Sequence, residues 1–92
     1  MSVNHVEGTD RGKVMLYALS TCGWCKKTKG LLAELGVAYS YTDVDTLSGS
    51  DKQAVVDEVK KWNPSCSFPT LVINGSSCIV GFKEDDIRNA LK

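Results

Sequence analysis

The stretch KVMLYALSTCGWCKK, residues 13–27, places two cysteines directly behind a short apolar run. The run Lys13–Leu19 has the length and apolar content of a buried β-strand. Thr21 is a residue type that caps helices, and from Cys25 onward apolar side chains recur at helical spacing. The stretch therefore predicts a strand, a tight turn and a helix whose first turn contains both cysteines.

The rest of the chain predicts three more strands and two more helices. The strands before and after the first helix would run parallel and form a right-handed βαβ unit. Asn74-Gly75 is a strong hairpin signal between the last two strands. The order is thus β-α-β-α-β-β-α, with later elements at Val37–Val44, after Ser50 up to Asn63-Pro64, at Thr70–Ile73, at Ile79–Val80 and at Lys83–Leu91.

Length and composition are typical of a single globular domain: 92 residues, 42% hydrophobic and 24% charged. Eleven basic and eleven acidic residues cancel, so neither nucleic acid nor a membrane surface is expected as a partner. No apolar run approaches the roughly 20 residues of a membrane span, and the N-terminus lacks the apolar region of a secretory signal. We therefore expect a monomeric, cytoplasmic protein with a flexible tail over residues 1–12 and one domain over residues 13–92.

The two cysteines stand where redox chemistry is favoured. Cys22 falls in the first helical turn, where free N–H groups and the helix dipole favour the thiolate, which is the reactive form. Cys22 can attack a target disulfide, and Cys25, one turn later, can resolve the mixed disulfide. A structural disulfide is the alternative, but across so short a loop it removes little chain entropy. Asp43 and Asp45 are expected to shape a loop rather than to transfer protons.

Three motifs give the chain a family resemblance. TCGWC follows a strand, SFPT precedes a hairpin, and GFKEDD precedes the last helix. Together they resemble the glutaredoxin branch of the thioredoxin superfamily over nearly all of residues 13–92. The resemblance implies a thioredoxin-like α/β fold with a four-stranded mixed sheet flanked by helices. It also implies a thiol–disulfide oxidoreductase with Cys22 and Cys25 as catalytic residues and with no bound cofactor or metal.

The resemblance further implies a groove for protein substrates beside the cysteine pair. The matching proline, Pro69, is cis in the family and turns the backbone of Phe68 toward an extended substrate, as in strand addition. Trp24, between two reactive thiols, is expected to be exposed and to contact partners. The substrate-binding residues expected on these grounds are Gly23, Trp24, Phe68, Pro69, Thr70, Gly81 and Phe82.

Two segments that bind glutathione in glutaredoxins differ in this chain. Leu19 and Ser20 stand where such proteins usually carry a lysine, and Val80-Gly81-Phe82-Lys83 replaces their Gly-Gly segment. The latter is similar to the segment in NrdH-redoxins, which serve ribonucleotide reductase and take electrons from a flavin thioredoxin reductase. We therefore expect reduction of protein disulfides, with ribonucleotide reductase as one candidate, by electrons from a thioredoxin-reductase-type or ferredoxin-linked reductase. A glutathione-dependent glutaredoxin is the alternative.

Four cysteines raise an alternative from another functional class, an iron–sulfur or metal-binding carrier. Beyond the first pair, Cys66 and Cys78 are separated by eleven residues, whereas a zinc ribbon needs a second close pair. A cluster shared between two chains through Cys22 would need the glutathione site, which is altered here. Cys66 and Cys78 are interpreted as partly buried, inert thiols, with a regulatory thiol site at Cys66 as the alternative.

Overall fold

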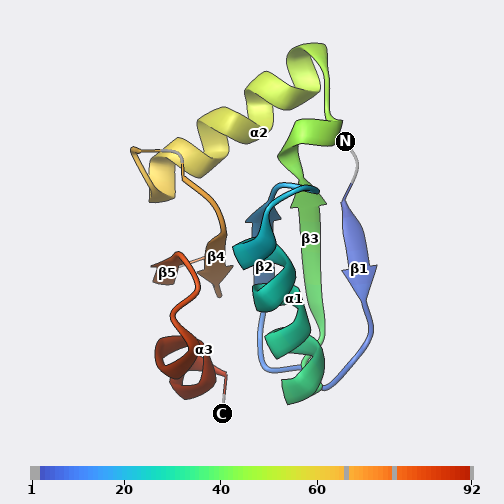
Figure 1. The fold of residues 1–92 in the computed structure, drawn as a ribbon, viewed down its shortest axis with the longest axis vertical. Helices are drawn as coiled ribbons and strands as arrows, with labels where there is room; N and C mark the ends of the chain where they lie inside the picture. The colour runs from blue at the N-terminus through green and yellow to red at the C-terminus, as the bar shows by residue number, and fades with distance from the viewer. Residues whose placement is uncertain (1–2, 66, 76, 92) are drawn as a thin grey trace.

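The computed structural model describes residues 3–65, 67–75 and 77–91, and it contains a five-stranded mixed sheet with helices on both faces (Figure 1). The strands are β1 (Asn4–Val6), β2 (Val14–Ala18), β3 (Tyr39–Asp43), β4 (Thr70–Ile73) and β5 (Ser77–Val80). The helices are α1 (Gly23–Leu35), α2 (Gly49–Trp62) and α3 (Glu84–Ala90), with a short 3-10 helix η1 (Val44–Thr46) after β3. The strand order across the sheet is β1-β3-β2-β4-β5.

The connections follow from the turn signals in the sequence. Strands β2 and β3 are parallel and are joined by α1, as the βαβ unit predicted, whereas β4 pairs antiparallel with both β2 and β5. Asn74 and Gly75 have positive φ values of 57° and 65°, the conformation that a tight hairpin turn requires. The predicted order β-α-β-α-β-β-α is therefore confirmed, with one strand added before it.

That added strand corrects the expectation of a four-stranded sheet. Strand β1 lies within residues 1–12 and pairs antiparallel with β3, so that His5 stands opposite Ser40. Its sequence, Asn-His-Val, is short and mostly exposed, and it lacks the apolar alternation that marks a half-buried strand. The next residues are held by the hydrogen bond from Thr9 N–H to the Gly36 carbonyl, at 2.7 Å. A Cβ on Gly8 would come 2.7 Å from the Gly36 carbonyl oxygen, so the close approach needs glycine.

Some element boundaries also differ from the prediction. The second predicted strand, Val37–Val44, is shorter at both ends: it begins at Tyr39, and it ends at Asp43 because the backbone turns into η1 at Val44. The last strand begins two residues earlier than predicted, at Ser77, because pairing with Ile73 extends the hairpin ladder.

Two apolar layers fix the helices to the sheet. Helices α1 and α3 cover one face, where Leu16, Leu32 and Ile87 are fully buried. Helix α2 covers the other face through Val55 and Val59. The first turn of α1 is thereby held at the carboxyl end of β2 (Figure 1). Over the described ranges, none of the helices combines the length and the apolar character needed to cross a membrane.

Candidate functional site

The two cysteines of the CxxC motif lie at the start of α1 in different environments. Cys22 is the N-cap residue, and its Sγ accepts a hydrogen bond from the Cys25 N–H at 3.2 Å. Cys22 is half-buried, whereas Cys25 is completely buried in the core between α1 and the sheet. The Cys25 Sγ accepts a hydrogen bond from the Leu19 N–H at 3.5 Å. One sulfur is therefore accessible and the other lies behind it.

The environment of Cys22 favours its thiolate. Burial raises the pKa of Cys22, but hydrogen bonds from the Cys25 side chain and from the N–H groups of Cys25 and Trp24 outweigh burial and lower the pKa below its ordinary value. These N–H groups belong to the first turn of α1 and have no partner within the helix. A helix N-terminus thus stabilises negative charge on this sulfur.

The environment of Cys25 has the opposite effect. Burial, followed by the hydrogen bond of the thiol to Cys22, raises the pKa of Cys25 to about 12. The Leu19 N–H and the charge of Lys29 lower this pKa, but they do not offset burial. At neutral pH, Cys25 is therefore a thiol that donates to the sulfur of Cys22.

A carboxylate from η1 holds the loop that leads into Cys22. The Asp45 carboxylate accepts two hydrogen bonds from Ser20, one from its N–H at 2.8 Å and one from its hydroxyl at 2.6 Å. These bonds lower the pKa of Asp45, so the carboxylate stays ionised in mildly acidic solution. The Cys22 N–H then donates to the Leu19 carbonyl at 3.2 Å and closes the turn. The expectation that Asp45 shapes a loop agrees with this contact.

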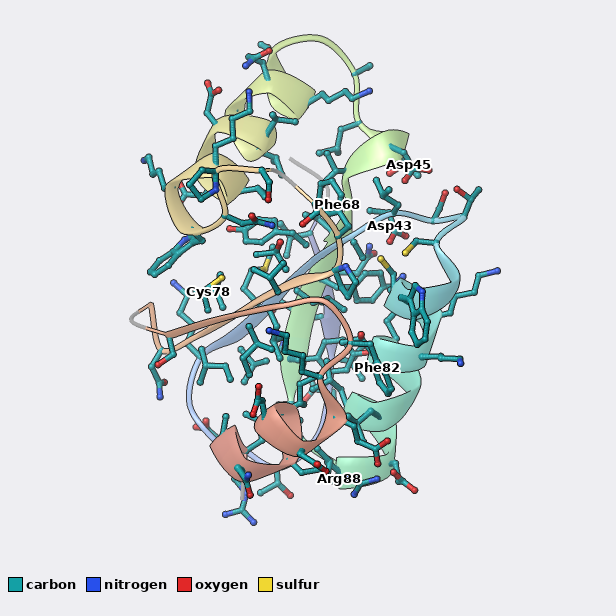
Figure 2. All side chains as sticks on the ribbon, turned by 60° about the vertical axis from the view of Figure 1, so that its left-hand side comes forward. Asp43, Asp45, Phe68, Cys78, Phe82 and Arg88 are labelled. Atoms are coloured by element: carbon teal, nitrogen blue, oxygen red, sulfur yellow. The ribbon has the colours of Figure 1, made fainter. Side chains whose placement is uncertain are left out.

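A shallow groove of about 230 Å³ lies next to the cysteine turn. Three segments line it: Trp24 from α1, Phe68-Pro69 before β4, and Gly81-Phe82 after β5. The Phe68–Pro69 peptide bond is cis, the isomer that the resemblance implies, and the Pro69 carbonyl accepts a hydrogen bond from the Gly81 N–H at 2.8 Å. In Figure 2, Phe68 and Phe82 lie on the side of the molecule where α1 begins.

The aromatic side chains along the groove are ordered by contacts with one another. The rings of Trp24 and Phe82 stack with centroids 6.0 Å apart and an interplanar angle of 28°. The Lys27 ammonium lies 4.5 Å from the centroid of the Trp24 ring. Trp24 nevertheless remains 58% exposed, which is unusual for so large an apolar side chain. The ring is therefore fixed in place and available for contact with a partner.

Two of the expected substrate-binding residues lie outside the lining of this groove. Gly23 is exposed at the first position of α1. Thr70 is fully buried, and its hydroxyl donates to the Ser67 carbonyl at 2.8 Å. The side chain of Asn63 donates to the Thr70 hydroxyl at 3.3 Å, so this threonine ties β4 to the end of α2.

An ion pair next to the cysteine helix is not evident from the sequence. Lys29 Nζ lies 2.9 Å from a carboxylate oxygen of Asp43, and the two side chains are only 24% and 19% exposed. The same ammonium lies 4.3 Å from the centroid of the Tyr41 ring. In the sequence, Lys29 looks like one of several surface lysines on the helix, and its partner on β3 becomes evident only in the folded chain.

Of the two remaining cysteines, the structure describes Cys78, which does not line the groove. Cys78 lies on β5, away from Phe68 and Phe82 in Figure 2, and burial raises the pKa of its thiol. Cys66 lies outside the described residues, so both interpretations of it, the inert thiol and the alternative of a regulatory site, stay predictions. Among the described residues, no three histidine, cysteine or acidic side chains are grouped to hold a metal ion.

Comparison with known proteins gives consistent matches. A sequence model of the Glutaredoxin family matches residues 14–78. A glutaredoxin-like protein of 8.6 kDa from the rubredoxin operon of Clostridium pasteurianum is 30% identical, over 86% of this chain and 97% of that protein. The match to Glutaredoxin-C1 of Arabidopsis thaliana, 28% identical, spans only about half (49%) of that protein.

Solved structures extend the similarity to the whole fold. The crystal structure of a glutaredoxin from Methanosarcina mazei Go1 is 57% identical, covers 97% of this chain and 86% of that chain, and superposes with a TM-score of 0.91. The crystal structure of Methanosarcina acetivorans methanoredoxin is 54% identical, covers 91% and 88%, and has a TM-score of 0.89. The expectation of a thioredoxin-like fold is therefore confirmed.

Proposed function

The chain belongs to the glutaredoxin family, whose members exchange thiols and disulfides, and from this premise we propose that it is a dithiol protein-disulfide oxidoreductase. Opposite pKa shifts of two thiols within one helical turn carry the proposal. The lowered pKa of Cys22 supplies the attacking thiolate, while the raised pKa of Cys25 keeps a proton on the second sulfur until it is needed.

The reaction proceeds in two exchanges. The Cys22 thiolate attacks one sulfur of a target disulfide, and the other target sulfur leaves as a thiolate and takes up a proton. Cys25 then loses its proton to water, and its thiolate attacks the Cys22 sulfur. The bond between Cys22 and the target breaks, the target leaves reduced, and the Cys22–Cys25 disulfide holds the two-electron oxidation.

The groove next to the pair supports a protein substrate. Trp24, Phe68 and Phe82 line it with aromatic surface, while Gly81 leaves room for a backbone to approach. A disulfide on an extended segment could place an apolar neighbour against these rings. Ribonucleotide reductase is one candidate target, and we propose a cytoplasmic location, where a reduced dithiol is maintained.

The electrons are proposed to come from a reductase of the thioredoxin-reductase or ferredoxin-linked type. None of the five residues that line the groove is charged, whereas glutathione presents two carboxylates. The side chain of Ser20, near the position of the usual lysine, is engaged by Asp45. Lys27, beside Trp24, is the cation that favours the alternative, a glutathione-dependent enzyme.

Trapping tests the function. The Cys25→Ser variant, mixed with a disulfide protein such as insulin, is expected to accumulate an adduct on Cys22 that non-reducing electrophoresis and mass spectrometry detect. The Cys22→Ser variant is the matched control and should form no adduct at the motif. Failure of Cys25→Ser to trap any adduct would count against the proposed order of the thiols.

The donor is tested separately with the oxidised wild-type protein. Reduction of the Cys22–Cys25 disulfide is followed with glutathione alone, with NADPH and a flavin thioredoxin reductase, and with a ferredoxin-linked reductase. We expect one of the reductases to be faster. Equal or faster reduction by glutathione would replace the proposed donor with the alternative.

A further inference from the structure

The resolving thiol, Cys25, lies where ionisation is unfavourable, and the apolar side chains of the neighbouring strands do not stabilise its thiolate. It must become a thiolate to attack the mixed disulfide, yet it is completely buried. The strands β2 and β4 contribute apolar side chains to the core that contains it, namely Val14, Leu16, Ala18, Leu71 and Ile73. A thiolate formed there has little water around it, so any nearby fixed charge acts on it with little screening.

The other elements around Cys25 limit which charges can act. On α3, Ile87 packs in the same core, while the charged Arg88 is bonded at the surface to Glu84 and Glu34. Besides Cys22, helix α1 carries Lys26, Lys27, Lys29 and Glu34, and of these four only Lys29 is not exposed. Strand β3 carries Tyr39, Tyr41 and Asp43. Among the described cations, the half-buried Lys29 is the one whose charge acts on Cys25.

The position of Lys29 is fixed by three features. It follows Cys25 by four residues on α1, a spacing that places two side chains on the same helical face. Asp43 holds its ammonium at 2.9 Å, and the Tyr41 ring lies beneath it at 4.3 Å. Asp43 is aligned with Ala18 in the parallel pair of β2 and β3, directly before the loop whose Leu19 N–H reaches the Cys25 sulfur. Figure 2 shows the Asp43 side chain near the start of α1.

We propose that Lys29 is a positioning residue for the second exchange, in which its charge, held in place by Asp43 and Tyr41, favours the thiolate of Cys25 over the thiol. The charge of Lys29 does lower the pKa of Cys25, against the larger effect of burial. The inference rests on the proposed function, because it concerns only the step in which Cys25 displaces the target from Cys22. Lys29 takes no proton in this step, since the proton of Cys25 leaves to water.

The expected effect follows from two opposing changes. Loss of the cation raises the pKa of Cys25, and each unit of that rise reduces the thiolate fraction about tenfold. A less acidic thiol is also about threefold more nucleophilic as a thiolate. The net slowing of the second exchange is therefore about threefold for each unit, while the first exchange, made by Cys22, is unchanged.

Stopped-flow reaction of the reduced protein with the aromatic disulfide dithiobis(nitrobenzoate) separates the two exchanges. The first release of coloured thiolate depends on reagent concentration, and the second, intramolecular release does not. Cys66 and Cys78 are replaced by serine in all proteins compared. Lys29→Gln is expected to slow only the second release, by about threefold at each pH. Lys29→Arg should restore the rate, and Lys26→Gln, at an exposed position on the same helix, should leave it unchanged.

Asp43→Asn tests whether positive charge near Cys25 speeds the second exchange. The asparagine oxygen can still accept a hydrogen bond from Lys29, but the negative charge that partly neutralises Lys29 is gone. We expect its second release to be as fast as wild type or faster. A wild-type rate in Lys29→Gln, or an equal slowing in Asp43→Asn, overturns the role of the Lys29 charge. Absence of any second release from the wild-type protein instead overturns the proposed function, and the inference with it.

Discussion

The unequal acidity of the two active-site thiols predicts a strong preference in their alkylation. Burial raises the pKa of Cys25 to about 12, whereas the pKa of Cys22 lies below its ordinary value of 9.0, so the gap is at least about three units. At neutral pH this gives Cys22 about a thousandfold higher thiolate fraction. The more basic thiolate is intrinsically about 15- to 30-fold more reactive, which leaves a net preference of about 50-fold for Cys22. The complete burial of Cys25 acts in the same direction.

Limited treatment of the reduced protein with iodoacetamide measures this preference. Only Gly23 and Trp24 separate the two cysteines, so both fall on one proteolytic peptide, and fragment-ion spectra assign the label to one sulfur or the other. The matched control is the same reaction in denaturant, where both thiols are solvated and the preference should fall toward one. Labelling of Cys25 at a rate within about fivefold of Cys22 in the folded protein would refute the assignment of attacking and resolving thiols.

Three further predictions concern stability and substrate binding. The raised pKa of Cys25 contributes stability that is present below its unfolded value of 9.0 and is lost as the pH rises toward 12. The reduced protein should therefore lose about 1.4 kcal/mol relative to Cys25→Ser between neutral pH and about pH 10 in urea unfolding, and parallel pH profiles would contradict this. Leu32→Ala, at a fully buried position, should lower the free energy of unfolding by about 3 kcal/mol, and a loss below about 1 kcal/mol would show a looser core. Trp24→Ala should raise KM for a protein disulfide about tenfold while changing the alkylation rate of Cys22 by less than about twofold, and equal effects on both would place Trp24 in the chemistry rather than in substrate binding.

The sequence predicted the elements whose patterns are local. The apolar run before Cys22 and the helical spacing after Cys25 placed β2 and α1 within a residue or two, and Asn74-Gly75 placed the β4–β5 hairpin. Local patterns suffice there because each element buries a regular stripe of its own side chains.

The groove was predicted by a different route. Trp24, Phe68 and Phe82 belong to three separate segments of the chain, and only the family resemblance of three short motifs brought them together in advance. Periodicity carries no information about which loops meet at one end of a sheet.

The contacts that the sequence did not reveal depend on how β2 and β3 are aligned. The Lys29–Asp43 pair forms because α1 returns the chain to the sheet with Asp43 opposite Ala18, and no pattern within either segment specifies that alignment. The bidentate contact between Asp45 and Ser20 has the same origin. Lysine, serine and aspartate are common surface residues, and these four make their contacts only because the crossover from β2 to β3 places them next to each other.

Strand β1 has a consequence for the behaviour of the protein in concentrated solution. It occupies the outer edge of β3, whose backbone N–H and C=O groups would otherwise be open to the edge of another sheet. The three residues of β1, which are mostly exposed, thus protect the edge of β3 from pairing with another molecule. A minimal domain cut at residue 13 would keep both cysteines and every residue that lines the groove, yet it would bare an edge that includes the aromatic side chains Tyr39 and Tyr41. Shortening the chain is therefore a greater hazard to its solubility than to its chemistry.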